Sequence, residues 1–498
     1  MTANPLKPLD PGAFDQWKAR HLLTRAGFGG TTSQAQALAD LGFEAAVDYI
    51  VNYEDIATPA PVTANDFESG IMRPPTSTER QNIRRARQSG DESMVEKLRL
   101  ERQRRQKEDR RQIAEMQEWW LRRMIETPRP LEEKLTLFWH GHFATGYRTI
   151  EDSYHMFLQN AFLRTNACGN FKDDLVRGII RDPAMIEYLD NDQNRKQAPN
   201  ENLARELMEL FTLGEGQGYT EDDIKQGARA LTGYTYNDDQ FVFRAGSHDD
   251  GVKSILGSRG QYDGDDFVDL IFARPSATEY ILWKMYRFFV NDLPQGETEK
   301  STTFVKALAR EFRRRRWAVK PVLRAIFLSE HFYDPVNDRA VIKSPIQLIV
   351  QAVRTLNPPN RKQLLRTLIT AGDLMGQRLF FPPSVKGWDG GRAWVNTSTM
   401  FMRHNTLLFL LTGQRPDGYA WEADSARFDA MAHLPEGMPT PERVIDHLLQ
   451  VHLGTPTPPS DRKATLRDYL RGRGDRIDNA TLTGMFTLIT TMPEYQLS

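Results

Sequence analysis

The 498-residue sequence contains a single cysteine, Cys168. One thiol cannot form an intrachain disulfide, and it cannot supply the several thiolates of a cysteine-rich zinc site. A bound metal ion would therefore need histidine, carboxylate or amide ligands. The chain has only ten histidines, so their positions carry information.

Long apolar runs and an excess of one charge sign are also missing. No stretch approaches the ~18 consecutive apolar residues of a membrane-spanning helix, and the N-terminal region has no apolar segment of signal-peptide length. We therefore expect no membrane span and a cytoplasmic location for the chain as written, or export if a leader has been removed. The 65 basic and 66 acidic residues nearly cancel, so we expect no nucleic acid as a partner.

Helical periodicity dominates what is present, and 40% of the residues are hydrophobic, enough for a substantial core. We predict a mainly α fold, with residues 1–498 forming a single large multi-helical domain with long irregular loops. Only residues 233–257 suggest a small β-hairpin, because aromatic and β-branched residues flank an Asn-Asp-Asp turn.

A proline-rich segment and a highly charged segment stand next to each other. Residues 53–80 lack periodicity, which predicts a surface loop. Residues 91–127 contain neither glycine nor proline, which predicts a long helix, and its first half is almost entirely charged. We interpret 78–126 as an elaboration of the helical domain, and 91–126 as a contact for a protein partner.

The heptapeptide LFWHGHF, residues 137–143, places His140 and His142 one residue apart in an aromatic frame. Burial penalises charged imidazoles, so the pair favours a polar or metal-binding site. On a strand or an extended loop, alternate side chains point the same way, and both rings would face one metal. Zinc, manganese and iron all accept neutral imidazole. Either histidine alone is more typical of a hydrogen-bonded core or surface residue.

The segment NENLARELMELFTLG, residues 200–214, is predicted to be an amphipathic helix. One face carries Asn202, Glu206 and Glu209, with Arg205 beside them. Two carboxylates at i, i+3 can converge on one ion, as in helical-bundle metal sites. The alternative is an exposed face on which the arginine forms ordinary i, i+4 ion pairs.

Further polar residues cluster in three loops. The loop that enters the helix supplies Asp190, Asn191 and Asn200, and the segment after the hairpin supplies His248, Asp249 and Lys253. The Pro/Gly/Trp loop, residues 380–400, combines aromatic and polar side chains that suit a sugar or a planar group, although tryptophan also pins loops to a core. The residues of interest in that loop are Trp388, Arg392 and Trp394.

Six segments carry a resemblance to a known family. They are HLLTRAGFG, FWHGHF, DPAMIEYLDN, PNENLARELMELFTLGEGQGYTEDDIKQGARALTGY, HDDGVKSILG and PPSVKGWDGGRAWVN. In this order they resemble the large bacterial family of domain of unknown function 1800, over nearly the whole chain. The resemblance carries over no catalytic residue. It implies an association with envelope or polymer metabolism, because relatives are often encoded beside proteins that resemble sulfatases and phosphatases.

The family pattern stresses positions that the residue types had already grouped: His140, His142, Asp190, Asn191, Asn200, Glu201, Asn202, Arg205, Glu206, Glu209, His248 and Asp249. We therefore expect a metal-dependent enzyme, hydrolytic by preference, with an unknown substrate. The expected ligands of a divalent zinc, manganese or iron ion are His140, His142, Asp190, Glu206, Glu209 and His248.

In the expected mechanism, a metal-activated water attacks the substrate, with Glu206 or Glu209 as base and Arg205 or Lys253 stabilising negative charge. The expected substrate contacts are Asn191, Asn200, Asn202, Asp249, Trp388, Arg392 and Trp394. Redox-metal oxygen chemistry fits the same ligands. The non-enzymatic alternative is a helical scaffold or assembly protein, in which the polar cluster is a structural ion-pair network.

Overall fold

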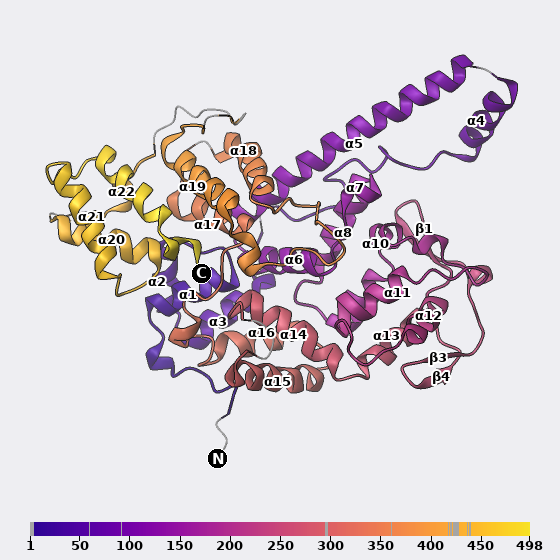
Figure 1. Cartoon of the computed structure of the whole chain (residues 1–498), viewed down its shortest axis with the longest axis horizontal. Helices are drawn as coiled ribbons and strands as arrows, with labels where there is room; N and C mark the ends of the chain where they lie inside the picture. Colours follow the sequence, from indigo (N-terminus) through magenta and orange to yellow (C-terminus); the bar gives the residue numbers. More distant parts are fainter. Residues whose placement is uncertain are drawn as a thin grey trace.

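The computed structural model describes residues 4–58, 60–90, 92–293, 297–359, 361–416, 418, 421, 428–435, 437 and 440–498. Over these residues the chain forms 22 α-helices and four short strands, which confirms the predicted mainly α fold (Figure 1). None of the described helices is both long and apolar enough to cross a lipid bilayer.

The helices of the N-terminal half are α1 (Gln16–Ala26), α2 (Thr32–Asp40), α3 (Phe43–Val51), α4 (Ser77–Ser89), α5 (Glu92–Glu126), α6 (Pro130–His142), α7 (Tyr147–Ile150), α8 (Ser153–Thr165), α9 (Arg177–Ile179), α10 (Pro183–Tyr188), α11 (Asn202–Glu206) and α12 (Glu221–Ala230). Those of the C-terminal half are α13 (Gly264–Phe272), α14 (Ser276–Phe289), α15 (Glu299–Arg314), α16 (Val319–Leu328), α17 (Pro345–Leu356), α18 (Arg361–Leu374), α19 (Thr397–Thr412), α20 (Pro441–Leu453), α21 (Ser460–Gly472) and α22 (Asn479–Thr491).

The predicted long helix is confirmed as α5, whose first half extends away from the body with α4 beside its far end (Figure 1). Thr76 and Glu79 form a capping box that starts α4, and Gly90 ends it with φ 67°. The prediction of a loop as far as Arg80 is therefore wrong for its last four residues. We call α4 and the first half of α5 the helical arm.

Two short antiparallel hairpins lie near each other in the sequence. The predicted one is confirmed, with β1 (Tyr234–Asn237) paired to β2 (Gln240–Phe243). The second pairs β3 (Lys253–Ile255) with β4 (Ser258–Gly260) and was not predicted. Both residues of its turn, Leu256 and Gly257, have positive φ, and leucine is unusual where asparagine or aspartate normally stands.

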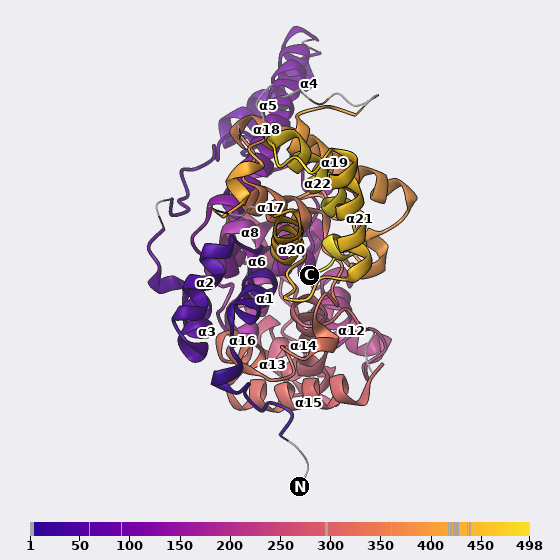
Figure 2. The same ribbon diagram turned by 90° about the vertical axis from the view of Figure 1, so that its left-hand side faces the viewer.

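Two apolar clusters form the interior. One is built by α1–α3 and α12–α16, and the other by the buried half of α5 together with α17–α22. Figure 2 shows α18, α19 and α22 in the upper part and α13, α14 and α15 in the lower part. Helix α6 contributes Leu131 and Leu135 to the first cluster and Leu137 to the second, so it lies between them. The expectation of a single domain stays a prediction.

Candidate functional site

Helix α6 carries both histidines of LFWHGHF in its last turn. The expected strand or extended loop is wrong here, because Pro130 starts a helix that reaches His142, buried at every position from Leu131 except Gly141. Residues two apart on a helix are separated by about 200°, so their side chains point to opposite sides. His140 accepts a hydrogen bond at Nε2 from the backbone N–H of Phe380, at 3.1 Å. The histidine pair therefore does not face one common point.

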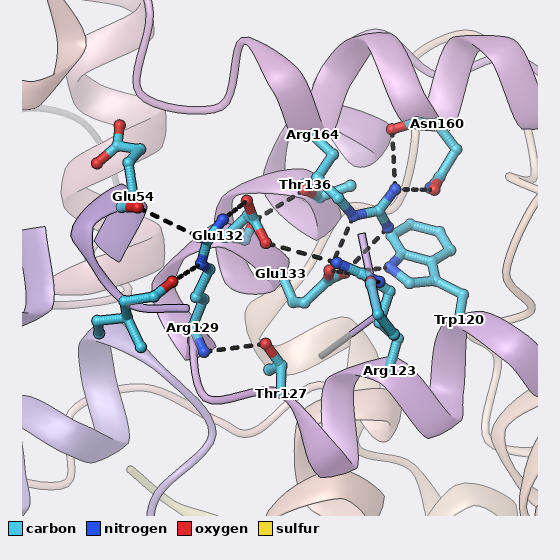
Figure 3. A network of polar contacts seen from close by, with 12 residues as sticks. Glu54, Trp120, Arg123, Thr127, Arg129, Glu132, Glu133, Thr136, Asn160 and Arg164 are labelled. Atoms are coloured by element: carbon cyan, nitrogen blue, oxygen red, sulfur yellow. Dashed lines mark hydrogen bonds and ion pairs between the residues drawn. The ribbon is translucent and has the colours of Figure 1, made fainter. Parts of the chain in front are cut away.

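A buried ion-pair network holds α6 in place (Figure 3). Glu133 of α6 is fully buried and accepts hydrogen bonds from Trp120 Nε1 at 2.9 Å and Arg123 Nε at 2.7 Å, both on α5. Arg164 of α8 donates to the same carboxylate from Nε at 2.8 Å and from Nη2 at 3.0 Å. Burial alone would raise the pKa of Glu133, but Arg164 and Arg123 outweigh burial and lower it. The carboxylate is ionised and links three helices.

His142 lies on the other side of α6, beside a lysine of α14. Its Nε2 lies 3.0 Å from the backbone oxygen of Phe211, so we assign the ring proton to Nε2. Nδ1 is then an acceptor, and Lys284 Nζ donates to it at 3.1 Å. Burial first, and then the positive charge of Lys284, lowers the pKa of His142 well below its usual value. The imidazole is therefore neutral.

Lys284 is half-buried, with no carboxylate among its described hydrogen-bond and ion-pair partners. Its Nζ also donates to the backbone oxygen of Leu210 at 3.3 Å. Burial, followed by repulsion from Lys386 and Arg287, lowers the pKa of Lys284 to about 7. Near neutral pH the side chain is therefore present both as ammonium and as free amine.

The helix that was predicted for residues 200–214 contributes backbone carbonyls to this site. After α11 it continues as a π-helical turn, Leu207–Thr212. Carbonyls in the last turn of a helix lack a following N–H partner. Those of Leu210 and Phe211 instead accept hydrogen bonds from Lys284 and His142. π-Helical turns are frequent at functional sites, and here the turn directs two carbonyls to the lysine–histidine pair.

A cavity of about 280 Å³ opens next to this pair, which we call the tryptophan cavity. Its walls come from α6, α14, the start of α17 and the loop 386–394. The loop lies against α6 because Gly387 has φ 79°, and a Cβ there would overlap the backbone oxygen of Gly141. The side chains that define its chemistry are His142, Lys284, Arg287, Asp292, Gln347, Gln377, Lys386, Trp388, Asp389 and Trp394.

Three predicted site residues line this cavity: His142, Trp388 and Trp394. Arg392 is exposed and does not line it. The sequence analysis missed Lys284, although a signal exists. It is the only lysine in the apolar run ATEYILWKMYRFFV of α14, and its Nζ contacts His142 in the cavity wall.

The predicted carboxylate face forms ordinary ion pairs. Arg205 contacts Glu221 at 2.7 Å, Glu201 at 3.1 Å and Glu209 at 3.4 Å. All four side chains are at least a fifth exposed, so each pair contributes at most about 1 kcal/mol. Burial first, and then Glu209, raises the pKa of half-buried Glu206. This face matches the surface ion-pair alternative.

The other predicted polar residues fix loops to the hairpins. Asn191 donates to the backbone oxygen of Tyr234 at 2.9 Å, and Asp249 pairs with Arg229 at 2.7 Å. The Lys253 amine donates to backbone oxygens, that of Gly251 at 3.2 Å.

Among the remaining residues predicted for the site, His248 and Asn200 hydrogen-bond to nearby backbone groups. His248 Nδ1 lies 2.8 Å from the backbone oxygen of Thr232. Asn200 Oδ1 accepts from the backbone N–H of Asn202 at 2.9 Å. Asp190 is exposed, with φ 55°. None of these side chains reaches the tryptophan cavity.

The predicted ligand set does not fit a divalent metal as one centre. His140 and His142 face opposite sides of α6, where each has its own hydrogen-bond partner, and Glu209 is paired with Arg205. Within the described ranges, no three His, Cys, Asp or Glu side chains are grouped for a common ion. Binding of zinc, manganese or iron, and redox chemistry with it, stay predictions.

The fold and site together define a mainly α-helical protein with an aromatic cavity, in whose wall lies a lysine with its pKa lowered to about 7. A family model described as Protein of unknown function (DUF1800) matches residues 21–497, and the chain belongs to this family. This confirms the resemblance seen in the sequence. No curated protein and no solved structure matches the chain.

Proposed function

We propose that this protein is a hydrolase that cleaves an ester bond of a carbohydrate-like substrate in the tryptophan cavity, with Lys284 as general base. The observation that carries the proposal is the position of Lys284 in a cavity wall, where its Nζ contacts neutral His142 and a backbone carbonyl and no described carboxylate. Burial accordingly lowers the pKa of Lys284 to about 7. A general base works best when its pKa lies near the working pH. Clusters of perturbed titratable groups in a cavity are typical of functional sites.

The hydrogen bonds of Lys284 suit a base. A neutral amine has two N–H bonds and one lone pair. The two N–H bonds match the two acceptors present, His142 Nδ1 and the Leu210 carbonyl. The lone pair is then available to a water molecule in the cavity.

The walls of the cavity suit a sugar ring. Trp388 and Trp394 offer apolar faces on which a ring can stack, and Gln347 and Gln377 offer amide groups for hydroxyls. A cavity of about 280 Å³ has room for one sugar ring with its ester group, and no room for a second ring.

In the proposed reaction, neutral Lys284 takes a proton from water, and the resulting hydroxide attacks the acyl carbon. The Lys284 ammonium formed in this step stabilises the tetrahedral oxyanion. Arg287 and Lys386, also in the cavity wall, are paired with Asp292 and Asp389 at 2.8 and 3.1 Å and keep the two carboxylates away from the oxyanion. The intermediate expels the alkoxide, which receives the proton from the Lys284 ammonium. One water and one ester become one acid and one alcohol.

The test uses 4-nitrophenyl acetate and O-acetylated xylo-oligosaccharides as probes. Lys284→Arg keeps the charge but cannot act as a base, and Lys284→Met removes both properties. We expect each variant to lose at least about 10²-fold in kcat/KM. Lys320→Met, which removes an exposed lysine paired with Glu54, is the matched control.

The wild-type rate should rise with pH through a midpoint of about 7. Hydrolysis by Lys284→Arg within threefold of wild type would contradict the proposal. So would a rate without an inflection near neutral pH.

The helical arm supports a second candidate function, that of an assembly subunit with an acidic protein partner. Residues 77–111 carry twelve Arg and Lys against seven Asp and Glu, and the arm exposes Val95 and Leu100. Binding of poly-L-glutamate that weakens with salt and is lost in Arg102→Glu/Arg104→Glu would support it. Tighter binding to duplex DNA than to poly-L-glutamate would contradict it.

A further inference from the structure

A second cavity, of about 260 Å³, lies away from the tryptophan cavity. Its walls come from α1, the segment 333–343, α17, the end of α20 and the C-terminal residues of the chain. We call it the α1–α20 cavity. Helix α1 belongs to the first apolar cluster, and α17 and α20 belong to the second, so the cavity lies where the two meet.

Two buried cations line this cavity without an acidic partner. Arg20 is 7% exposed, and its guanidinium forms no hydrogen bond or ion pair with the described residues. Lys343 is 2% exposed, and its one hydrogen bond from Nζ within the described part of the chain goes to the backbone oxygen of Tyr495, at 2.6 Å. Buried charges in proteins are normally paired, because desolvation strongly disfavours an isolated ion.

The acidic residues of the cavity wall already have partners of their own. Asp15 lies 3.8 Å from Lys18, and Asp338 lies 3.3 Å from Arg339. Asp334, the third, pairs with a lysine outside the cavity, Lys300. Neither Arg20 nor Lys343 therefore forms an ion pair with an aspartate of this wall among the described residues.

Several neutral polar atoms in the same wall are also buried and unsatisfied. They are Nε2 of His21, both ring nitrogens of His452, Oε1 of Gln351 and the hydroxyl of Tyr333. Native proteins leave few such atoms unpaired, and a cluster of them around a cavity points to a missing partner. The Tyr333 hydroxyl and one N–H of the neutral His452 ring can donate to an acceptor-rich ligand, whereas Gln351 Oε1 and the other His452 nitrogen can only accept.

The electrostatics agree with this geometry. Burial lowers the pKa of Arg20 to about 10. Burial, with Arg20 and Arg403 next, lowers the pKa of Lys343 to about 7. Burial, with Arg25 next, lowers the pKa of His21 to about 3. The positive charges of Arg20, Arg25, Lys343 and Arg403 add up around this cavity. A bound anion would offset them.

We propose that the α1–α20 cavity is a binding site for the phosphoryl group of a small molecule, held by Arg20 and Lys343. A phosphoryl group brings three strong acceptor oxygens and close to two negative charges, which match two cations and several neutral donors. A carboxylate has two oxygens and one charge. The cavity volume fits a small phosphorylated compound or inorganic phosphate.

The test uses inorganic phosphate as the probe on the full chain at pH 7, with sulfate and acetate compared at equal ionic strength. Affinity is measured by isothermal titration calorimetry and thermal stability by differential scanning fluorimetry. Arg20→Met and Lys343→Met are the test variants. Lys18→Met is the matched control, since Lys18 lies in the same wall but is paired with Asp15.

Phosphate should raise the melting temperature of wild type and of Lys18→Met. Arg20→Met should weaken phosphate binding at least tenfold, the size expected for one charge-assisted hydrogen bond. The same variant should melt at a higher temperature than wild type without phosphate, because it removes an unpaired buried charge. If Arg20 instead stabilised the fold, Arg20→Met would melt at a lower temperature than wild type without phosphate.

Three results would overturn the proposal. The first is equal stabilisation of all four proteins by phosphate, which would place the anion elsewhere. The second is absence of phosphate binding together with a lower melting temperature of Arg20→Met. The third is tighter binding of acetate than of phosphate.

Discussion

Replacing Glu133 by glutamine removes the carboxylate that joins α5, α6 and α8. This carboxylate is fully buried and accepts four hydrogen bonds from Trp120, Arg123 and Arg164. A glutamine at this position retains one oxygen but turns an amide NH₂ toward N–H donors, and it leaves two arginines less compensated. Breaking a buried ion pair on one side costs about 3–5 kcal/mol. We expect Glu133→Gln to lose about 3 kcal/mol of unfolding free energy.

Urea unfolding followed by far-UV circular dichroism measures this loss. The control is Glu115→Gln, because Glu115 pairs with Arg111 on the same helix, but the two side chains are 54% and 78% exposed. Removing such a pair should cost less than about 0.5 kcal/mol. Equal unfolding midpoints for the two variants would refute the assignment of Glu133 as an anchor of α6.

The pH dependence follows from the lowered pKa of Glu133 in the folded state. A carboxyl whose pKa is lower in the folded than in the unfolded chain stabilises the protein above the unfolded value, about 4.3. This stabilisation is lost as pH falls through the folded value. The difference in stability between wild type and Glu133→Gln should therefore shrink below about pH 4.

Three further predictions concern single positions. Gly387→Ala places a Cβ on the Gly141 carbonyl oxygen, so it should destabilise the protein by about 1–3 kcal/mol more than Gly390→Ala. At Gly390 φ is also positive, but no atom lies near the added Cβ, so equal melting temperatures of the two variants would contradict this prediction. Burial raises the pKa of Cys168 to about 12, so iodoacetamide at pH 8 should label it only after unfolding, as mass spectrometry can show; labelling of the folded protein would contradict this. Burial alone would lower the pKa of His155, but three nearby carboxylates raise it to about 9. Its stabilisation is then complete below about pH 6.5 and lost as pH rises through 9, so His155→Gln should shift the urea midpoint more at pH 6 than at pH 10, and equal shifts would count against it.

Hydrophobic periodicity was sufficient to predict most of the fold. The uninterrupted run from Glu92 to Glu126 is one helix, and the segment that begins at Asn202 is helical with Arg205 in i, i+4 ion pairs. Both features are local, so neighbouring residues determine them. The second hairpin was missed because Leu256 occupies a turn position at which its side chain gives no turn signal.

The candidate site was predicted only in part, because its parts meet through tertiary packing. A buried apolar run such as LFWHGHF has the same composition in a strand and in a helix, and periodicity does not separate the two. In the helix, His142 turns to Lys284 and His140 turns away from it. His142 and Lys284 are 142 positions apart in the sequence, so no local sequence pattern could have paired them.

The central claim is that the Lys284 amine is neutral for a substantial fraction of the time near pH 7. The most direct measurement is an NMR titration of the protein labelled with ¹³C at the lysine ε position. The resonance that is absent from Lys284→Met identifies the residue, and Lys343→Met separately identifies the other lysine whose pKa is lowered to about 7. We predict a midpoint of about 7 for Lys284. A midpoint near the ordinary lysine value of about 10.4 would contradict the account.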